Sequence, residues 1–299
     1  MKPRILLVPG IGDIHWVMLK MQSFIEINEL ETPEIWIWNF DNRPRGLEFI
    51  ERIPFVTPGG YWDGPVEGKN KKTFNAMYNN GEYDILKNFE DFDYLICPNG
   101  SLRFKESFER DIMPEYKCNW EYPLSVTDEE LNYMADNLEA GPYILLFFSR
   151  FGMFRQWLTR WGPKAIRTYL DYIHRMLPKH RLILTGSEWD VNLNDELSGM
   201  CGNHIENLAG KTSLSQLLGL IRGASAFTGW CGGNTIISSY LGAKTYILWS
   251  DFFRPCMSYN WASPKSLNNN YIFDDISQIG PDMAATRLIS LIMEGVNDR

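Results

Sequence analysis

The fold is decided by a stretch that begins at residues 143–148, Tyr-Ile-Leu-Leu-Phe-Phe. This run is apolar at every position, which is typical of a strand buried on both faces of a parallel sheet. The dipeptide Gly162-Pro163 then opens a helical pattern over Pro163–Met176, and Arg181–Thr185 is a second apolar run. The order strand, helix, strand predicts a parallel, doubly wound sheet.

The same alternation continues on both sides of this stretch. Towards the C-terminus we expect strands at 226–228 and 245–249 and helices at 214–221, 234–241 and 281–293. Towards the N-terminus we expect strands at 5–8, 35–38 and 94–97 and helices at 14–29 and 46–53. Residues 57–80, rich in Gly, Pro, Asn and Lys, predict a long surface excursion. The pattern therefore predicts two consecutive α/β domains, over residues 1–141 and 142–299, with the boundary at the turn-like Gly141-Pro142.

Composition indicates an ordinary globular chain. Its 299 residues are 44% hydrophobic and 22% charged, which suits two modest domains and excludes a disordered protein. The net charge of −8 argues against tight, non-specific binding to nucleic acid. The apolar runs are too short for a membrane span or a secretion signal, so we expect a cytoplasmic protein without a transmembrane segment.

Cysteine and histidine usage predicts no metal. The five cysteines are scattered and include no Cys-x-x-Cys pair, and there are four histidines, so neither a disulfide framework nor a structural zinc site is expected. Asp91-Phe92-Asp93 has the Asp-x-Asp pattern of some metal sites, but it precedes a strand instead of following one.

The first candidate site is Gly10-Ile11-Gly12-Asp13, directly after the first expected strand. A carboxylate at this position is either a helix cap or a general base. His15 lies two residues further on, and Asn99 follows the strand at 94–97 at the same sheet edge. Gly12, His15 and Asn99 are therefore candidate residues of the same site. The glycine pattern is not Gly-x-Gly-x-x-Gly, so a dinucleotide cofactor is not expected.

The second and third candidate sites suit an anion. Ser149, Arg150 and Arg155 follow the strand at 143–148, and arginine makes paired hydrogen bonds to phosphate; the alternative is a solvated basic loop. The run Cys231-Gly232-Gly233-Asn234-Thr235 leads from a strand into a helix. Free amides at a helix N-terminus bind anions, although a tight packing turn has the same composition.

Together these motifs resemble the heptosyltransferase-like glycosyltransferases, the ADP-heptose:lipopolysaccharide group. Residues 10–13 are similar to that family's opening motif, and Arg155-Gln156-Trp157 is similar to its Lys-x-Trp segment. Residues 207–214, Asn-Leu-Ala-Gly-Lys-Thr-Ser-Leu, resemble its Leu-x-Gly-x-Thr-x-Leu junction. The similarity covers about residues 143–250 and is confined to short motifs before them. Cys231 and Ile236 stand where the family has Asp and His, so the resemblance does not carry heptose over as the donor sugar.

The resemblance implies an α/β protein of GT-B architecture, with two facing Rossmann-like domains, doubly wound around parallel sheets. It implies an inverting, metal-independent transfer from a nucleotide-diphosphate sugar to an acceptor glycan or other hydroxyl, with no separate cofactor. Asp13 would be the general base, and the acceptor side would be at Gly12, His15 and Asn99. The donor phosphates would lie at the second and third sites. The donor's nucleotide and sugar would lie along the edge of the second sheet, at Gly186, Glu188, Leu208, Ala209, Gly210, Cys231 and Asp251.

Two other functions stay open. The chain could glycosylate a modified base in DNA, through the basic residues Arg43, Arg45, Lys69, Lys71 and Lys72. It could also be a non-catalytic carbohydrate- or nucleotide-binding protein, because the family's donor-motif Asp is replaced.

Overall fold

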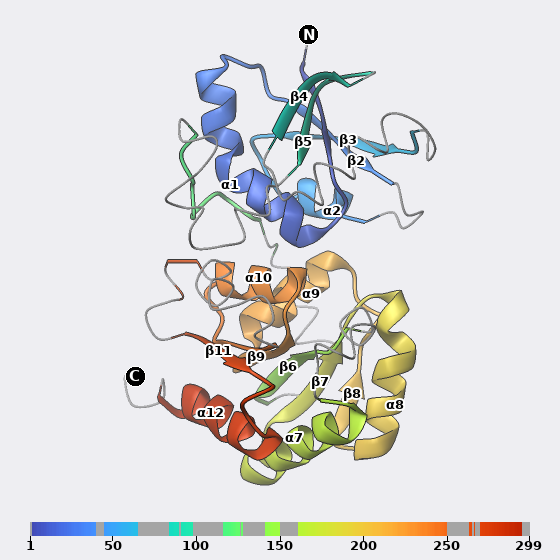
Figure 1. Cartoon of the computed structure of the whole chain (residues 1–299), viewed down its shortest axis with the longest axis vertical. Helices are drawn as coiled ribbons and strands as arrows, with labels where there is room; N and C mark the ends of the chain where they lie inside the picture. The colour runs from blue at the N-terminus through green and yellow to red at the C-terminus, as the bar shows by residue number, and fades with distance from the viewer. Residues whose placement is uncertain are drawn as a thin grey trace. The chain divides into compact units, whose positions relative to one another are not determined.

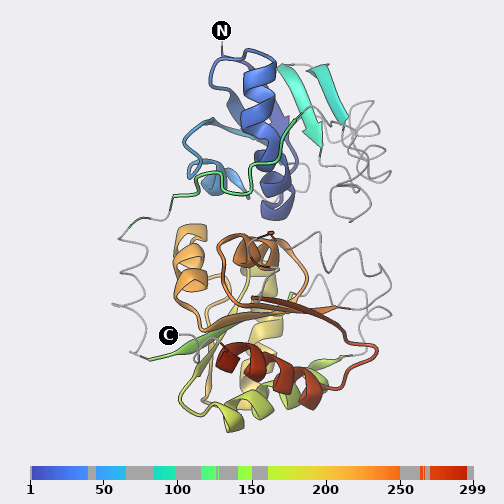
Figure 2. The ribbon, with the colours of Figure 1, turned by 90° about the vertical axis from the view of Figure 1, so that its left-hand side faces the viewer.

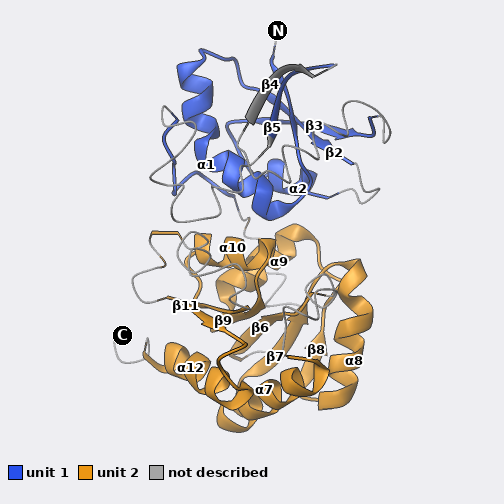
Figure 3. Ribbon diagram, in the orientation of Figure 1, with its two compact units in different colours: residues 1–125 blue, residues 126–299 orange. Residues whose placement is uncertain are grey.

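The computed structural model divides the chain into two compact units, unit 1 over residues 1–125 and unit 2 over residues 126–299 (Figure 3). The structure describes residues 2–39, 45–64, 84–89, 91–97, 116–125, 127, 141–149, 161–249, 263–264, 266 and 270–294. The division precedes the boundary predicted at 141/142, and between the two points only residues 127 and 141 are described.

Unit 1 is built on a mixed sheet with the strand order β3-β2-β1-β5-β4. Its elements, drawn in Figure 1, are β1 (Arg4–Leu7), α1 (Ile11–Ile27), β2 (Glu34–Trp38), α2 (Leu47–Ile50), β3 (Thr57–Trp62), β4 (Asp84–Phe89) and β5 (Phe92–Cys97). The first three strands and β5 are parallel, and the edge strand β4 is antiparallel to β5. The strand order reverses between β1 and β5, so the carboxyl end of β1 lies at a topological switch point.

The prediction that residues 57–80 form a surface excursion is wrong at its start, because Thr57–Trp62 forms β3 alongside β2. The reason lies in Gly59. A Cβ at this position would come 2.3 Å from the indole Nε1 of Trp36 on β2, so glycine leaves room for the neighbouring strand's large side chain. Here the glycine serves sheet packing, although a glycine-rich composition taken alone predicts a loop. Residues 65–80 lie outside the described ranges.

Unit 2 has an entirely parallel sheet with the order β11-β10-β9-β6-β7-β8. Its strands are β6 (Tyr143–Phe147), β7 (Arg181–Thr185), β8 (Ile205–Asn207), β9 (Ala226–Trp230), β10 (Thr245–Trp249) and β11 (Tyr271–Asp275). This is the strand order of a dinucleotide-binding Rossmann sheet, and its switch point lies between β6 and β9. The parallel sheet predicted from the buried apolar runs is thus confirmed.

Helices cover both faces of this sheet (Figure 2). On one face α7 (Pro163–Met176) packs against α8 (Val191–Cys201) and α12 (Pro281–Glu294), and on the other face α9 (Leu214–Gly223) packs against α10 (Gly233–Tyr240). None of the described helices combines the length and the apolar character needed to cross a bilayer.

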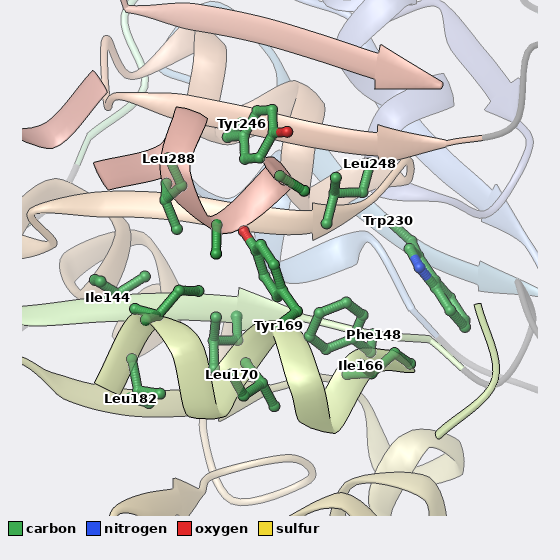
Figure 4. Close-up of a cluster of buried hydrophobic side chains, with 14 of the residues drawn as sticks. Ile144, Phe148, Ile166, Tyr169, Leu170, Leu182, Trp230, Tyr246, Leu248 and Leu288 are labelled. Carbon is green, nitrogen blue, oxygen red and sulfur yellow. The ribbon is translucent and has the colours of Figure 1, made fainter. Parts of the chain in front are cut away.

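A large cluster of buried hydrophobic side chains lies between the sheet of unit 2 and the helices α7, α8 and α12 (Figure 4). Tyr169 of α7 is wholly buried there, and its hydroxyl forms a 2.8 Å hydrogen bond with the hydroxyl of Thr228 on β9. Burial raises the pKa of Tyr169, so this hydroxyl stays protonated and the bond stays neutral. The bond connects α7 to the strand that leads into the glycine-rich run.

Candidate functional site

The strand-to-helix junctions of unit 2 are linked along the carboxyl edge of its sheet. The amide of Gly210, after β8, donates to the carbonyl of Gly186, after β7, over 3.0 Å. The hydroxyl of Ser149, after β6, donates to Oδ1 of Asp190 over 3.0 Å. These two bonds join the ends of three neighbouring strands into one continuous surface, at the edge where open α/β sheets bind their ligands.

The glycine-rich junction after β9 packs closely against β6. Gly229 has a φ of +141°, and a Cβ on it would come 2.0 Å from the carbonyl oxygen of Phe147. A Cβ on Gly232 would come 2.9 Å from Cε1 of the same phenylalanine. Both glycines therefore serve packing. They bring the start of α10 to the switch point, beside the residues that follow β6.

The first turn of α10 presents amides at this point. The hydroxyl of Thr235 accepts a 2.8 Å hydrogen bond from the amide of Gly232 and donates to that residue's carbonyl over 2.7 Å. Nothing in the described ranges accepts a hydrogen bond from the amides of Gly233 and Asn234, which are half-buried. Unpaired amides at the positive end of a helix dipole are suited to bind an anion.

A buried carboxylate, which the sequence did not identify, organises the junction after β7. Asp190 is 1% exposed. Besides the Ser149 hydroxyl, it accepts the amide of Ser187 over 3.0 Å, as part of a capping box. A Cβ on Gly186 would lie 2.8 Å from the Cβ of Asp190, so glycine is needed for this approach. Ser187-x-x-Asp190 is the sequence signal that could have revealed this residue. The exposed Glu188 lies in the same turn.

The junction after β8 adopts a fixed turn. Gly210 has a φ of +68°, and the amide of Ala209 donates to Oδ1 of Asn207 over 3.0 Å. Ser213 then caps α9 through a reciprocal pair of hydrogen bonds with Gln216. The run from Leu208 to Gly210 is thus held between a strand end and a capped helix.

In unit 1, Asp13 lies in the first turn of α1, at the carboxyl end of β1. Gly10, with a φ of +136°, begins this turn. A Cβ on Gly10 would come 3.1 Å from Oδ2 of Asp13, so the carboxylate lies over the helix start. Gly12 is buried and Asp13 is half-buried. This position suits both a helix-stabilising carboxylate and a base.

His15 faces the interior of unit 1. It is 1% exposed, and its Nδ1 forms a 2.8 Å hydrogen bond with the hydroxyl of Tyr122. Burial lowers the pKa of His15 to about 3, so the imidazole is neutral at physiological pH. The observed contact is a structural one, which ties α1 to the segment at 116–125.

Several predicted site residues lie outside the described ranges. Of the phosphate and donor candidates these are Arg150, Arg155 and Asp251, and of the acceptor candidates Asn99. Among the basic residues considered for DNA, Arg45 is described and Arg43, Lys69, Lys71 and Lys72 are not.

No protein-family model and no curated protein matches this sequence. Solved structures of similar fold include E. coli ADP-heptose lipopolysaccharide heptosyltransferase II, with 15% identity, a TM-score of 0.61 and 99% of each chain covered. They also include a glycosyl transferase of family 9 from Veillonella parvula, with 11% identity and a TM-score of 0.63 over 98% of this chain and 97% of that one.

A third similar structure belongs to a different kind of enzyme. It is the UDP-GlcNAc 2-epimerase of Neisseria meningitidis bound to UDP-GlcNAc, with 9% identity and a TM-score of 0.51 over 98% of this chain and 92% of that one. At such low sequence identities, the similarity to these solved structures shows the fold alone. It confirms the predicted α/β fold and, at that level, the resemblance to heptosyltransferase-like glycosyltransferases.

Proposed function

We propose that this chain is an inverting glycosyltransferase that moves a sugar from a nucleotide-diphosphate donor to an acceptor hydroxyl. The three solved structures of similar fold are named for enzymes of nucleotide sugars or glycosyl transfer, and two names specify the compound, ADP-heptose and UDP-GlcNAc. What the transferase and the epimerase have in common is the nucleotide sugar. The fold therefore supports the class of ligand, and the choice of reaction rests on the residues of this chain.

One observation carries the proposal: the amides of Gly233 and Asn234, for which no described residue is an acceptor, lie at the switch point of a Rossmann-ordered sheet. A diphosphate bound there would receive hydrogen bonds from both amides and would sit at the positive end of the α10 dipole. Arg150 and Arg155, which follow β6 in the sequence, are proposed to complete the charge balance. In this arrangement no divalent cation is required at the phosphates.

In the proposed reaction one bond forms and one breaks at the anomeric carbon, and one proton is transferred. The acceptor hydroxyl oxygen attacks the anomeric carbon from the face opposite the leaving group, and the bond from that carbon to the phosphate oxygen breaks. Asp13 takes the hydroxyl proton, and the electron pair leaves with the nucleoside diphosphate, whose charge the α10 amides stabilise. This chemistry requires the two units to face the same substrates, as in the GT-B architecture.

The remaining junction residues are proposed to hold the nucleotide and the sugar. Glu188 is exposed at a helix start, where its carboxylate can accept hydrogen bonds from hydroxyls of a ribose or sugar. Residues 208–210 supply a turn at the same edge, against which a base can lie. Asp190 is proposed as a positioning residue, because it holds the Ser149 hydroxyl and the turn that carries Glu188.

The experiment is thermal unfolding of the full chain with ADP, UDP, GDP and CDP and with their common sugar derivatives, without added metal. A ligand present at a hundred times its dissociation constant adds about 2.7 kcal/mol to the free energy of unfolding, which corresponds to a rise in Tm of about 5–10 °C. We expect one nucleotide and its sugar derivatives to produce this rise, and added Mg²⁺ to leave it unchanged.

The outcomes separate the candidate functions. Stabilisation together with transfer to an acceptor supports the proposal. Stabilisation without turnover against a broad set of acceptors identifies a binding protein, and conversion of the sugar without an acceptor identifies an epimerase. No stabilisation by any of these nucleotides contradicts the proposal.

A further inference from the structure

A cluster of metal-binding side chains lies on unit 2, away from the candidate donor edge. It consists of Asp171 on α7, Cys201 at the end of α8 and His204 in the turn before β8. One ligand atom from each residue lies within 4.8 Å of the other two. Both helices run antiparallel to the strands that precede them, so their C-terminal ends lie at the amino edge of the sheet, opposite the junctions described above.

The ligand atoms of the three side chains lie close together. Nε2 of His204 is buried and lies 3.6 Å from Oδ1 of Asp171, an ion-pair distance when the imidazole is protonated and longer than a hydrogen bond. The other carboxylate oxygen, Oδ2, accepts from Nε of Arg167 over 3.3 Å, which fixes the carboxylate with Oδ1 toward the histidine. Cys201 is buried and is a free thiol. An outer hydrogen bond to a ligating carboxylate is a common feature of metal sites.

A second histidine adjoins the cluster. His174 lies one turn after Asp171 on the same face of α7, and its ring stacks on that of His204 with centroids 4.1 Å apart and planes 17° apart. Its buried Nδ1 has no hydrogen-bond partner in the part of the chain that the structure describes. Two short spacings are thus involved: Asp171, Cys201 and His204 bring their ligand atoms together, and His174 adjoins them through its ring contact with His204. All four side chains are of types that bind zinc.

We propose that unit 2 binds one structural Zn²⁺ through Asp171, His174, Cys201 and His204. Zinc–ligand distances of about 2.0–2.3 Å imply about 3.3–3.8 Å between the ligand atoms of a tetrahedral site, so the cluster needs a small contraction and a turn of the His174 ring. The ion would join α7 to the end of α8 and to β8, the edge strand of the sheet. This inference is independent of the proposed sugar transfer.

Coordination would change the protonation of Cys201. A zinc-bound sulfur is a thiolate, so binding of the ion would release the thiol proton to the solvent, while the histidines would bind as neutral imidazoles.

The test is the metal content of the full chain after exposure to Zn²⁺ and exhaustive dialysis, measured by mass spectrometry. The variants are Cys201→Ser and Asp171→Asn. Asp171 is substantially exposed, so Asp171→Asn is expected to fold even if Cys201→Ser does not, which circular dichroism verifies. The matched controls are Cys118→Ser, a free cysteine of unit 1, and His180→Ala, in the turn before β7.

We expect about one zinc per chain in the wild type and in both controls, and at least a tenfold loss of affinity in Asp171→Asn and Cys201→Ser. Cobalt substitution should give a near-ultraviolet thiolate-to-cobalt band in the wild type that Cys201→Ser lacks. A wild type that retains no zinc, or zinc binding of wild-type affinity in a folded Asp171→Asn, overturns the assignment. Neither result would affect nucleotide binding, which is measured separately.

Discussion

Replacing Asp13 with asparagine should lower the rate of sugar transfer by about two to four orders of magnitude, the usual contribution of a general base. Asparagine keeps the size and hydrogen-bonding shape of the side chain but cannot take the acceptor's proton. Donor binding should stay within about twofold, because the proposed donor contacts lie in residues 142–299. Two quantities are measured with the nucleotide sugar that stabilises the protein. One is the rate at which nucleoside diphosphate is released in the presence of an acceptor, and the other is the Kd of the donor.

The alternative role of Asp13, a helix-stabilising carboxylate, predicts a different result. Its loss would then cost about 0.3–1 kcal/mol of unfolding free energy and leave the rate unchanged. Asp282→Asn is the matched control, because Asp282 occupies the first turn of α12 and takes no part in the proposed chemistry. If Asp13→Asn behaves like Asp282→Asn and keeps a near-normal rate of sugar transfer, Asp13 is not the general base.

Replacing Gly229 with alanine should destabilise unit 2 by more than about 4 kcal/mol, which is exceptional for one methyl group. Two causes act together. The φ of +141° is strained for any residue with a Cβ, and that Cβ would meet the carbonyl oxygen of Phe147 at 2.0 Å. Since both groups belong to the backbone of central strands, neither can move without opening the sheet. Urea unfolding followed by circular dichroism measures the loss.

Gly199→Ala is the matched control for this prediction. Gly199 lies within α8 and is exposed, and a Cβ added to it would meet no neighbouring side chain or strand within 4 Å. Alanine there should stabilise the protein by about 0.5–1 kcal/mol, because it is the better helix former. A Gly229→Ala protein whose unfolding free energy lies within about 1 kcal/mol of the wild type would contradict the close packing of β6 and β9.

Helices and strands whose apolar residues are buried against the sheet could be predicted from the sequence. β7, β10 and α7 have the predicted bounds, because continuous apolar runs and a helical period are direct consequences of packing on a parallel sheet. The elements it did not identify have weaker local signals. β8 has three residues, Ile-Glu-Asn, and α8 carries asparagines and a glycine that lower helix propensity. Their formation depends on contacts with the rest of the sheet.

The candidate site was predictable in outline. Junctions after parallel strands converge by topology, so Gly186 and Gly232 could be assigned to one edge from their positions in the chain, and Gly210 was placed there through the resemblance. Asp190 was not predicted, because its importance arises from a contact with Ser149, far away in sequence. His15 was expected beside Asp13, but successive positions of a helix face different directions, and its side chain points into unit 1.

The proposed zinc ligands illustrate the same limit. A search for Cys-x-x-Cys does not find Cys201-Gly202-Asn203-His204, and its partners Asp171 and His174 lie on a different helix, earlier in the chain. Nothing in the local sequence indicates that the ends of α7 and α8 meet. Only the packing of the two helices on one face of the sheet brings these side chains together.

The donor diphosphate is proposed to bind the first amides of α10, and a pair of variants at Gly233 can measure the contribution of one of these amides. Gly233→Pro removes the amide at the first helical position, where proline is compatible with the helix, as Pro163 and Pro281 already show in α7 and α12. Gly233→Ala adds a comparable Cβ and keeps the amide. Calorimetry with the stabilising nucleoside diphosphate should show about 10–100-fold weaker binding to Gly233→Pro than to Gly233→Ala, the contribution of one hydrogen bond to a charged group. Equal affinities in two folded variants would show that the phosphates bind elsewhere.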